Sequence, residues 1–117
     1  MDAYNANPSS MKAAILNFAA LDLPSKMLWI GGMKEMGTEE RNEHLELVKL
    51  IAQHQWQEVI LVGKEFEGIN NGYHWFGNSS DASHYISNHL PSHSSILIKG
   101  SRGSKMELMA ESLNPNP

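Results

Sequence analysis

The sequence contains no cysteine, which excludes a disulfide framework and any thiolate metal site. It has no apolar run of the length that a membrane-spanning helix needs. No block of basic residues accompanies its net charge of -4, so the electrostatic signature of a nucleic-acid-binding protein is missing. Together these absences argue against nucleic acid or a membrane as the partner, and they suit a reducing cytoplasm.

Recognisable metal-binding and nucleophile motifs are missing as well. The six histidines show no HExxH or comparable ligand spacing, so surface or half-buried positions are the expected ones for them. No spacing pairs a serine nucleophile with a histidine base either. We therefore expect neither a catalytic residue nor a metal ligand within this chain.

The chain does contain short apolar runs that alternate with segments of helical spacing. Buried strands are predicted at residues 27–30 and 59–62, and two further short strands at residues 73–76 and 96–98. Helices are predicted at residues 8–20, 38–52, 81–90 and 106–113, with a helical turn around Phe66. This alternation predicts an α/β fold: a Rossmann-like three-layer sandwich, with a mostly parallel sheet and helices on both faces.

The second helix carries clear local signals. Thr38 is its predicted N-cap, and Glu39 and Glu40 follow in the first turn, where carboxylates favour the positive end of the helix dipole. Its apolar face is predicted to consist of Leu45, Val48, Ile51 and Ala52.

Ligands of parallel α/β folds bind beyond the carboxyl ends of the strands. Loops at that edge are predicted at residues 31–37, 63–64 and 99–104. The opening segment, residues 2–7, joins them if a strand precedes it. The sequence therefore predicts a ligand site built from these segments.

The loop Lys99-Gly100-Ser101-Arg102-Gly103-Ser104 leaves a predicted strand, turns on two glycines and opens a predicted helix. Backbone N–H groups at a helix start suit an anion, and Lys99 and Arg102 add full positive charges. A glycine-permitted turn with solvated charges explains the same residues equally well, so both interpretations stay open at this point.

The opening segment holds an acid, a phenol and two amides directly before a predicted helix. Asp2 suits a ribose diol, and Tyr4 can stack on a ring. Asn5 and Asn7 can bond base edges or phosphate oxygens. Taken alone, these residues favour an Asx-rich turn in which Asn7 caps the helix and Pro8 occupies its first position.

Three segments resemble conserved blocks of the Mur ligase family, and the likeness covers nearly the whole chain. Asp2-x-Tyr4-Asn5-Ala6-Asn7-Pro8-x-Ser10-Met11 resembles the first block, in the version of the D-alanyl-D-alanine-adding member. Gly32-Met33-Lys34-Glu35-Met36-Gly37, followed by His44, resembles the second. Lys99-Gly100-Ser101-Arg102 with Met106-Glu107 resembles the third. In the second block Gly32 stands where the family has an aspartate, so no role for that carboxylate carries over.

The resemblance implies an ATP-dependent amide ligase that adds D-Ala-D-Ala to UDP-MurNAc-tripeptide in cytoplasmic peptidoglycan precursor synthesis. Residues 2–114 would form its C-terminal domain, with 115–117 as a tail and Met1 as an added start. The domains that hold the UDP-sugar, the phosphate-binding loop and Mg²⁺ would lie elsewhere in the full-length enzyme. The isolated domain would then be inactive.

The resemblance also implies two groups of binding residues. Asp2 would bond the ribose of ATP, with Tyr4, Asn5 and Asn7 near the nucleotide. The D-Ala-D-Ala end of the site would be formed by Lys99, Ser101, Arg102 and Ser104. The alternative hypothesis is a stand-alone, non-catalytic α/β module that binds a nucleotide or another anion.

Overall fold

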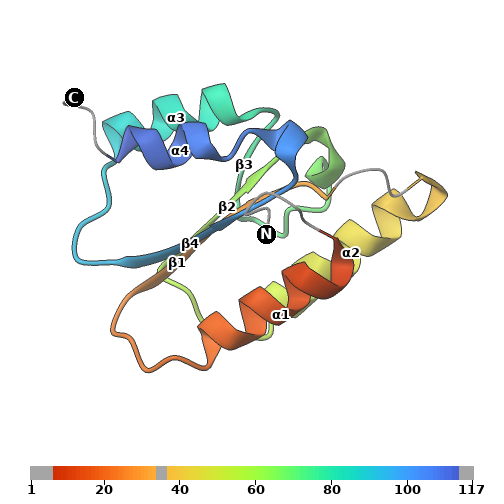
Figure 1. Ribbon diagram of the computed structural model, residues 1–117, viewed down its shortest axis with the longest axis horizontal. Coiled ribbons are helices and arrows are strands. Elements are labelled where there is room, and N and C mark those ends of the chain that lie inside the picture. Colours follow the sequence, from red (N-terminus) through yellow and green to blue (C-terminus); the bar gives the residue numbers. More distant parts are fainter. Residues whose placement is uncertain (1–6, 34–36, 114–117) are drawn as a thin grey trace.

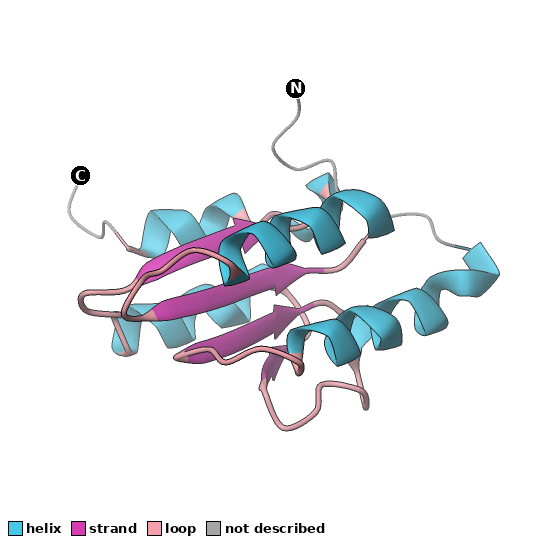
Figure 2. Cartoon of the chain, turned by 90° about the horizontal axis from the view of Figure 1, so that it is seen from below, coloured by secondary structure: helices cyan, strands magenta, loops and turns pink. Residues whose placement is uncertain are grey.

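The computed structural model describes residues 7–33 and 37–113, and these form a three-layer α/β sandwich (Figure 1). The central sheet has four strands, in the order β3-β2-β1-β4, and every neighbouring pair is parallel. Figure 2 shows the strands side by side and pointing the same way. The strands are β1 (Lys26–Gly31), β2 (Glu58–Val62), β3 (His74–Phe76) and β4 (Ser95–Lys99).

Helices cover both faces of this sheet, as the sequence predicts. The helices α1 and α2 lie on one face and α3 and α4 on the other (Figure 1). The α-helices are α1 (Pro8–Ala19), α2 (Glu40–Ile51), α3 (Ser79–Asn88) and α4 (Glu107–Ser112). Three short 3-10 turns are η1 (Gly37–Glu39), η2 (Lys64–Phe66) and η3 (Arg102–Ser104). The turn η2 confirms the predicted helical turn around Phe66.

Two hydrophobic clusters, one on each face of the sheet, hold the layers together. Along β1, Leu28 and Ile30 pack on the α1–α2 side, whereas Met27 and Trp29 pack on the α3–α4 side. Side chains of a strand alternate between the two faces, so a strand buried on both sides must be apolar throughout. The continuous apolar runs of the sequence follow from this double burial.

Both ends of α1 are satisfied by nearby side chains. Asn7 accepts a hydrogen bond from the Ser10 backbone N–H, and Ser10 Oγ accepts one from the Asn7 N–H, which forms a capping box. At the other end, Lys26 Nζ donates to the carbonyls of Ala19, Leu21 and Phe18 at 2.7, 2.8 and 3.2 Å. The predicted cap and first helical position of α1 are therefore confirmed.

The second helix begins later than predicted. Thr38 lies within η1 and does not cap α2, whose N-cap Glu39 makes no side-chain capping bond. Its buried face is also turned slightly from the predicted one, because Ala52 is exposed and Leu45 is only partly buried. The buried residues are His44, Leu47, Val48 and Ile51. The prediction that the histidines take surface or half-buried positions is thus wrong for His44.

The third and fourth helices differ from prediction at their starts. Asn78 caps α3, so that helix begins at Ser79, two residues before the predicted start. The loop after β4 does not open directly into a helix. It forms η3, and Lys105 then adopts a left-handed conformation (φ 53°) that separates η3 from α4. The helix-start contribution to the predicted anion site is therefore absent from this loop.

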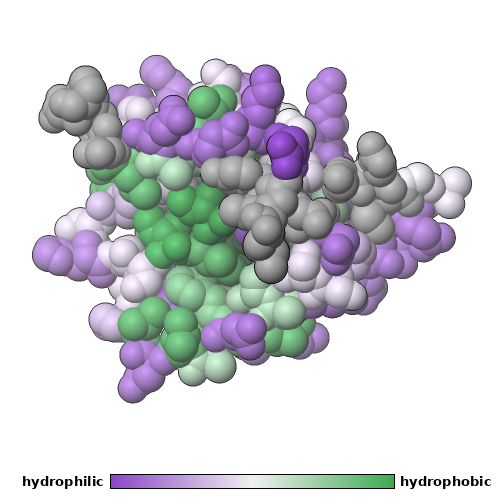
Figure 3. All heavy atoms as spheres, in the orientation of Figure 1, coloured by the Kyte–Doolittle hydropathy of each residue, from purple (hydrophilic) through white to green (hydrophobic). Residues whose placement is uncertain are grey.

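The face seen in Figure 3 carries a hydrophobic region over the edge strand β4. Ile96 and Ile98 pack partly against the α3–α4 cluster and Leu97 against the α1–α2 cluster, so all three stay partly accessible. Among the helices of the described ranges, none combines the length and the apolar character needed to cross a membrane.

Candidate functional site

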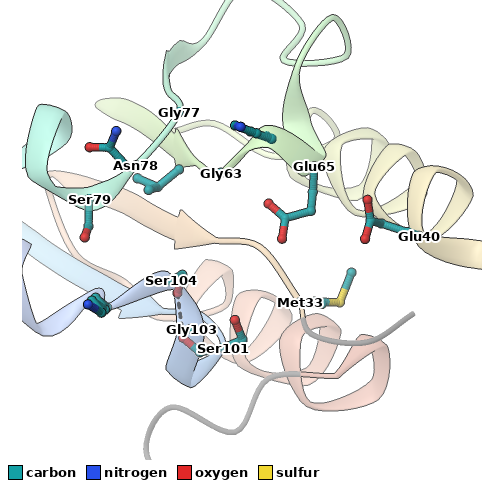
Figure 4. A pocket seen from close by; sticks show the side chains of 13 residues that line it. Met33, Glu40, Gly63, Glu65, Gly77, Asn78, Ser79, Ser101, Gly103 and Ser104 are labelled. Atoms are coloured by element: carbon teal, nitrogen blue, oxygen red, sulfur yellow. Dashed lines mark hydrogen bonds between the residues drawn. The ribbon is translucent and has the colours of Figure 1, made fainter. Parts of the chain in front are cut away.

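An open pocket of about 780 Å³ lies beyond the carboxyl ends of the strands, which we call the carboxyl edge (Figure 4). Every strand contributes a following loop to it, as parallel α/β folds require. The three loops predicted at this edge do converge there. The lining residues are Met33, Glu40, Val62, Gly63, Lys64, Glu65, Gly77, Asn78, Ser79, Ser101, Gly103, Ser104 and Lys105.

The backbone of Gly32 joins the loop after β1 to the end of β2 and to the loop after β4. Its N–H donates to the Val62 carbonyl at 3.0 Å, and its carbonyl accepts from the Ser101 N–H at 3.0 Å. The next loop is fixed in the same manner, because the Gly63 N–H donates to the Phe76 carbonyl at 2.8 Å. The floor of the pocket is therefore a continuous hydrogen-bonded backbone rather than a set of independent loops.

Two more glycines allow the loop after β4 to pack tightly on β1. A Cβ on Gly100 would lie 2.6 Å from Ser104 Oγ and 2.9 Å from the Gly31 Cα. A Cβ on Gly31 would meet the same serine oxygen at 2.6 Å and Met106 Sδ at 2.8 Å. Any side chain at either position would push Ser104 away, so these glycines set where Ser104 borders the pocket.

His44 positions the loop after β1 from behind the pocket. The Met33 N–H donates to His44 Nε2 at 2.9 Å, and His44 Nδ1 lies 2.6 Å from the Glu40 carbonyl. This pair of bonds assigns the neutral tautomer with the proton on Nδ1. The ring is fully buried and packs edge-on against Phe66 at 5.0 Å. His44 therefore fixes Met33, a pocket residue, to α2.

Serine side chains form the β4 side of the pocket (Figure 4). Ser104 Oγ donates to the Ser101 carbonyl at 2.6 Å. Ser101 is only 5% exposed, and its hydroxyl has no hydrogen-bond partner within the described ranges. Because Ser101 borders the pocket, its unpartnered hydroxyl is a candidate ligand contact.

Charged groups of both signs surround the same space. Lys64 and Lys105 line it, as do Glu40 and Glu65. Within the described part of the chain, none of these four side chains makes a hydrogen bond or an ion pair. The arrangement suits a ligand that carries both a negative and a positive group. Nowhere in that part do three or more His, Asp or Glu residues gather as a metal site.

Two of the four residues predicted to bind D-Ala-D-Ala line the pocket. Ser101 and Ser104 line the pocket, as proposed from the sequence. Lys99 is partly buried in β4, and Arg102 is exposed on η3, and neither is a lining residue. Lys105, which the sequence analysis did not single out, is the cation that borders the pocket on this side.

The predicted ATP-binding group lies mostly outside the described residues, because Asp2, Tyr4 and Asn5 fall before residue 7. Asn7 is described, and its side-chain oxygen caps α1. Its side-chain nitrogen has no partner in the described ranges. Figure 1 shows α1 beginning at the same end of the sheet as the pocket, so Asn7 stays compatible with its predicted role.

The pocket also contains residues after β3 and in η2 that were not predicted from the sequence. Gly77, Asn78 and Ser79 follow β3 directly, and Glu65 follows β2 by three residues. The rule that ligands bind after parallel strands would have found the first group, had it been applied to the predicted strand at residues 73–76. Glu65 had no such local signal beyond its nearness to the predicted loop at residues 63–64.

Comparison with known proteins gives a consistent result. The family described as Mur ligase, glutamate ligase domain, matches residues 1–102. UDP-N-acetylmuramoyl-tripeptide–D-alanyl-D-alanine ligase of Bacillus subtilis (strain 168) is 33% identical over 126 residues, covering 99% of this chain and 28% of the relative. The enzyme of the same name from Rickettsia prowazekii (strain Madrid E) is 33% identical over 116 residues, covering 94% and 26%. The chain thus spans about a quarter of these relatives.

Solved structures with a similar fold are likewise structures of MurF. A crystal structure of MurF from Acinetobacter baumannii superimposes with a TM-score of 0.80 at 28% identity, covering 98% of this chain and 27% of the other. MurF ligase from Thermotoga maritima, solved in complex with ADP, gives a TM-score of 0.76 at 22% identity, covering 96% and 26%. The second likeness concerns the fold alone.

Proposed function

Because this chain belongs to the Mur ligase family, we propose that residues 2–114 are the C-terminal domain of an ATP-dependent ligase that adds D-Ala-D-Ala to UDP-MurNAc-tripeptide. The carboxyl-edge pocket carries the proposal, because buried and charged groups there have no partner within the described ranges. The enzyme acts in peptidoglycan precursor synthesis in the cytoplasm. This domain closes over ATP and presents the dipeptide.

The reaction joins a carboxyl group to an amine in two steps. The terminal carboxylate of the tripeptide attacks the γ-phosphorus of ATP, which gives an acyl phosphate and ADP. The dipeptide amine then attacks the acyl carbon, forms the amide bond, and releases inorganic phosphate and a proton. An open pocket between domains suits this chemistry, because closure excludes water from the reactive acyl phosphate.

The dipeptide carboxylate is the ligand we assign to the β4 side of the pocket. Ser101 and Ser104 supply hydroxyls there and Lys105 supplies a positive charge. Lys99 and Arg102 belong to the same segment and complete the predicted group. A charge-assisted hydrogen bond to a carboxylate contributes about 1.5–3 kcal/mol, enough to set the affinity for a small dipeptide.

ATP is assigned to the opening segment, with Asp2 on the ribose and Tyr4, Asn5 and Asn7 near the nucleotide. The unpartnered side-chain nitrogen of Asn7, at the carboxyl edge, fits that assignment. Mg²⁺ is assigned to another domain of the full-length enzyme, where it would neutralise phosphate charge.

The test compares the full-length enzyme with the isolated chain. The full-length enzyme should release ADP only when ATP, UDP-MurNAc-tripeptide and D-Ala-D-Ala are all present, whereas the isolated chain should release none. Lys105→Gln should raise the KM for D-Ala-D-Ala by about tenfold, with little change in the KM for ATP. Arg102→Ala, which changes a residue outside the pocket lining, should raise the KM for D-Ala-D-Ala by a smaller factor but still more than that for ATP. Lys49→Gln, which changes an exposed lysine on α2, is the control and should leave both constants unchanged.

Two results would contradict the proposal. Steady ADP release by the isolated chain would show that the catalytic site lies within it. Micromolar binding of ATP to the isolated chain, together with a full-length protein that ligates nothing, would favour the alternative of a stand-alone nucleotide-binding module.

A further inference from the structure

The carboxylate of Glu65 rests directly on the backbone of two glycines. A Cβ on Gly32 would lie 2.6 Å from either carboxylate oxygen of Glu65, which is closer than real Cβ contacts come. A Cβ on Gly63 would collide with the Oε1 of the same side chain, and the φ of Gly63 is +125°, which already disfavours a side chain there. Glu65 therefore occupies space that exists only because residues 32 and 63 have no side chains.

Gly32 and Gly63, which we call the glycine seat, have a backbone that is fixed by hydrogen bonds. Both backbone groups of Gly32 are bonded, one to Val62 at the end of β2 and one to Ser101 in the loop after β4. The Gly63 carbonyl accepts from Trp75 Nε1 at 2.7 Å, and from the Phe66 N–H at 3.1 Å. The carboxylate of Glu65 can therefore occupy this position only while residues 32 and 63 are glycines, and the backbone beneath it is fixed by these hydrogen bonds.

Glu65 faces the pocket from the β2 side, opposite the serines of the β4 side (Figure 4). It is partly buried, yet it has no hydrogen bond or ion pair within the described ranges. Glu40, the other acidic lining residue, is exposed on α2 and has no comparable seat. The pocket thus places one partly buried carboxylate, unpaired among the described residues, across from hydroxyls and the positive charge of Lys105.

We infer that Glu65 determines specificity by binding the ammonium group of the incoming dipeptide. The inference rests on the proposed function. It adds that the site recognises the positively charged end of the dipeptide as well as its carboxylate. A single carboxylate suits an ammonium group, which presents three N–H donors to one acceptor. It does not by itself suit a metal ion, because no further acidic or histidine ligand completes a group around it in the described ranges.

This assignment gives Gly32 a role in the site. A side chain at residue 32 and the observed Glu65 position exclude each other, because an added Cβ would lie 2.6 Å from both carboxylate oxygens. The position of the Glu65 carboxylate, on the loop after β2, therefore requires glycine at residue 32.

The first test is Glu65→Gln in the full-length ligase. This change keeps the size of the side chain and removes its charge. The KM for D-Ala-D-Ala should rise about tenfold or more, while the KM for ATP changes less than about twofold. N-acetyl-D-Ala-D-Ala, which has no ammonium group, should inhibit the wild-type and variant enzymes with the same Ki. Glu67→Gln, on the same turn but outside the pocket, is the matched control.

The second test uses the glycine seat. Gly32→Ala should displace Glu65 and reproduce the rise in the KM for D-Ala-D-Ala. In a Glu65→Ala background, where no carboxylate is left to displace, the same change should add less than about twofold. Thermal unfolding of each variant shows whether the fold is retained.

The results of these tests distinguish a failure of the Glu65 inference from a failure of the proposed ligase function. An unchanged KM for D-Ala-D-Ala in Glu65→Gln, or an equal rise of that KM and the Ki of the N-acetyl compound, would overturn the inference while the ligase function stands. A wild-type enzyme that releases no ADP with these substrates would overturn the proposed function itself.

Discussion

Polar side chains at the two ends of the central sheet differ in whether they have hydrogen-bond partners. At the amino edge, where the strands begin, polar groups bond to one another. Ser25 Oγ donates to Gln57 Oε1 at 3.2 Å and lies 3.1 Å from Ser94 Oγ. Beside them, Glu58 Oε2 accepts from the Tyr85 hydroxyl at 2.9 Å and lies 3.0 Å from His74 Nε2.

At the carboxyl edge, backbone hydrogen bonds through Gly32 and Gly63 join the loops, but several side chains that border the pocket have no partner among the described residues. Ser101, Lys105 and Glu65 make no side-chain hydrogen bond or ion pair within the described ranges, although Ser101 is almost completely buried. Glycines at residues 31 and 100 replace side chains where the loops cross. Rigidity at this end therefore comes from the main chain.

Because of this difference, we expect polar side chains at the amino edge to stabilise the fold and unpartnered ones at the carboxyl edge to bind a ligand. A polar group that is already bonded within the protein stabilises the fold but offers nothing to a ligand. An unpartnered polar group contributes little to folding and gains its partner when a ligand binds. Substitutions at the carboxyl edge should therefore alter dipeptide kinetics, and those at the amino edge should alter stability alone.

The largest effect is expected at His44, which links stability to the pocket. His44→Ala removes a buried ring and leaves the Met33 N–H without its partner. The free energy of unfolding should fall by about 3–4 kcal/mol, and the KM for D-Ala-D-Ala should rise because Met33 lines the pocket. Urea unfolding and steady-state kinetics measure the two effects. His84→Ala, on an exposed position of α3, should change neither.

A smaller effect is expected where glycines let the loops cross. Gly100→Ala places a Cβ against Ser104 Oγ and the Gly31 backbone, which should lower the free energy of unfolding by about 1–3 kcal/mol and raise the KM for the dipeptide. Gly77→Ala is the matched control for stability alone, because nothing lies within 4 Å of its added Cβ although the residue lines the pocket. A cost for Gly77→Ala equal to that for Gly100→Ala would show that close packing is not the cause.

The smallest effect is expected at the amino edge. Tyr85→Phe removes the hydrogen bond to Glu58 and should lower the free energy of unfolding by about 0.5–1.5 kcal/mol, with no change in dipeptide kinetics. Tyr73→Phe is the control, because its hydroxyl has no hydrogen bond within the described part of the chain. Altered KM for D-Ala-D-Ala in Tyr85→Phe would break the proposed division between the two edges.

The dependence of stability on alkaline pH gives a second test of the role of Tyr85. Burial raises the pKa of Tyr85 above its ordinary value, and the hydrogen bond and negative charge of Glu58 raise it further. Because the folded state favours the protonated phenol, this stabilisation is complete below the unfolded pKa of about 10 and is lost as pH rises through the folded pKa. Between about pH 9 and about pH 11, Tyr85→Phe should therefore lose less stability than the wild type in urea unfolding.

The sequence by itself determined the alternation of strands and helices, the three-layer architecture and the edge where the site lies. These features depend on periodicity and on short-range signals, such as the cap Asn7 followed by Pro8, which act within a few residues. The same short range explains its errors. Thr38 resembles an N-cap, and only the intervening turn η1 shows that it does not serve as one.

Only the tertiary structure decided which side chains share the pocket. Lys99 and Lys105 are equivalent by composition, yet the register of β4 and the left-handed turn at Lys105 bring only the second to the pocket lining. The seat of Glu65 on Gly32 joins residues 33 positions apart in the sequence. Such contacts depend on how strands pair and loops cross, and no local pattern in the sequence records them.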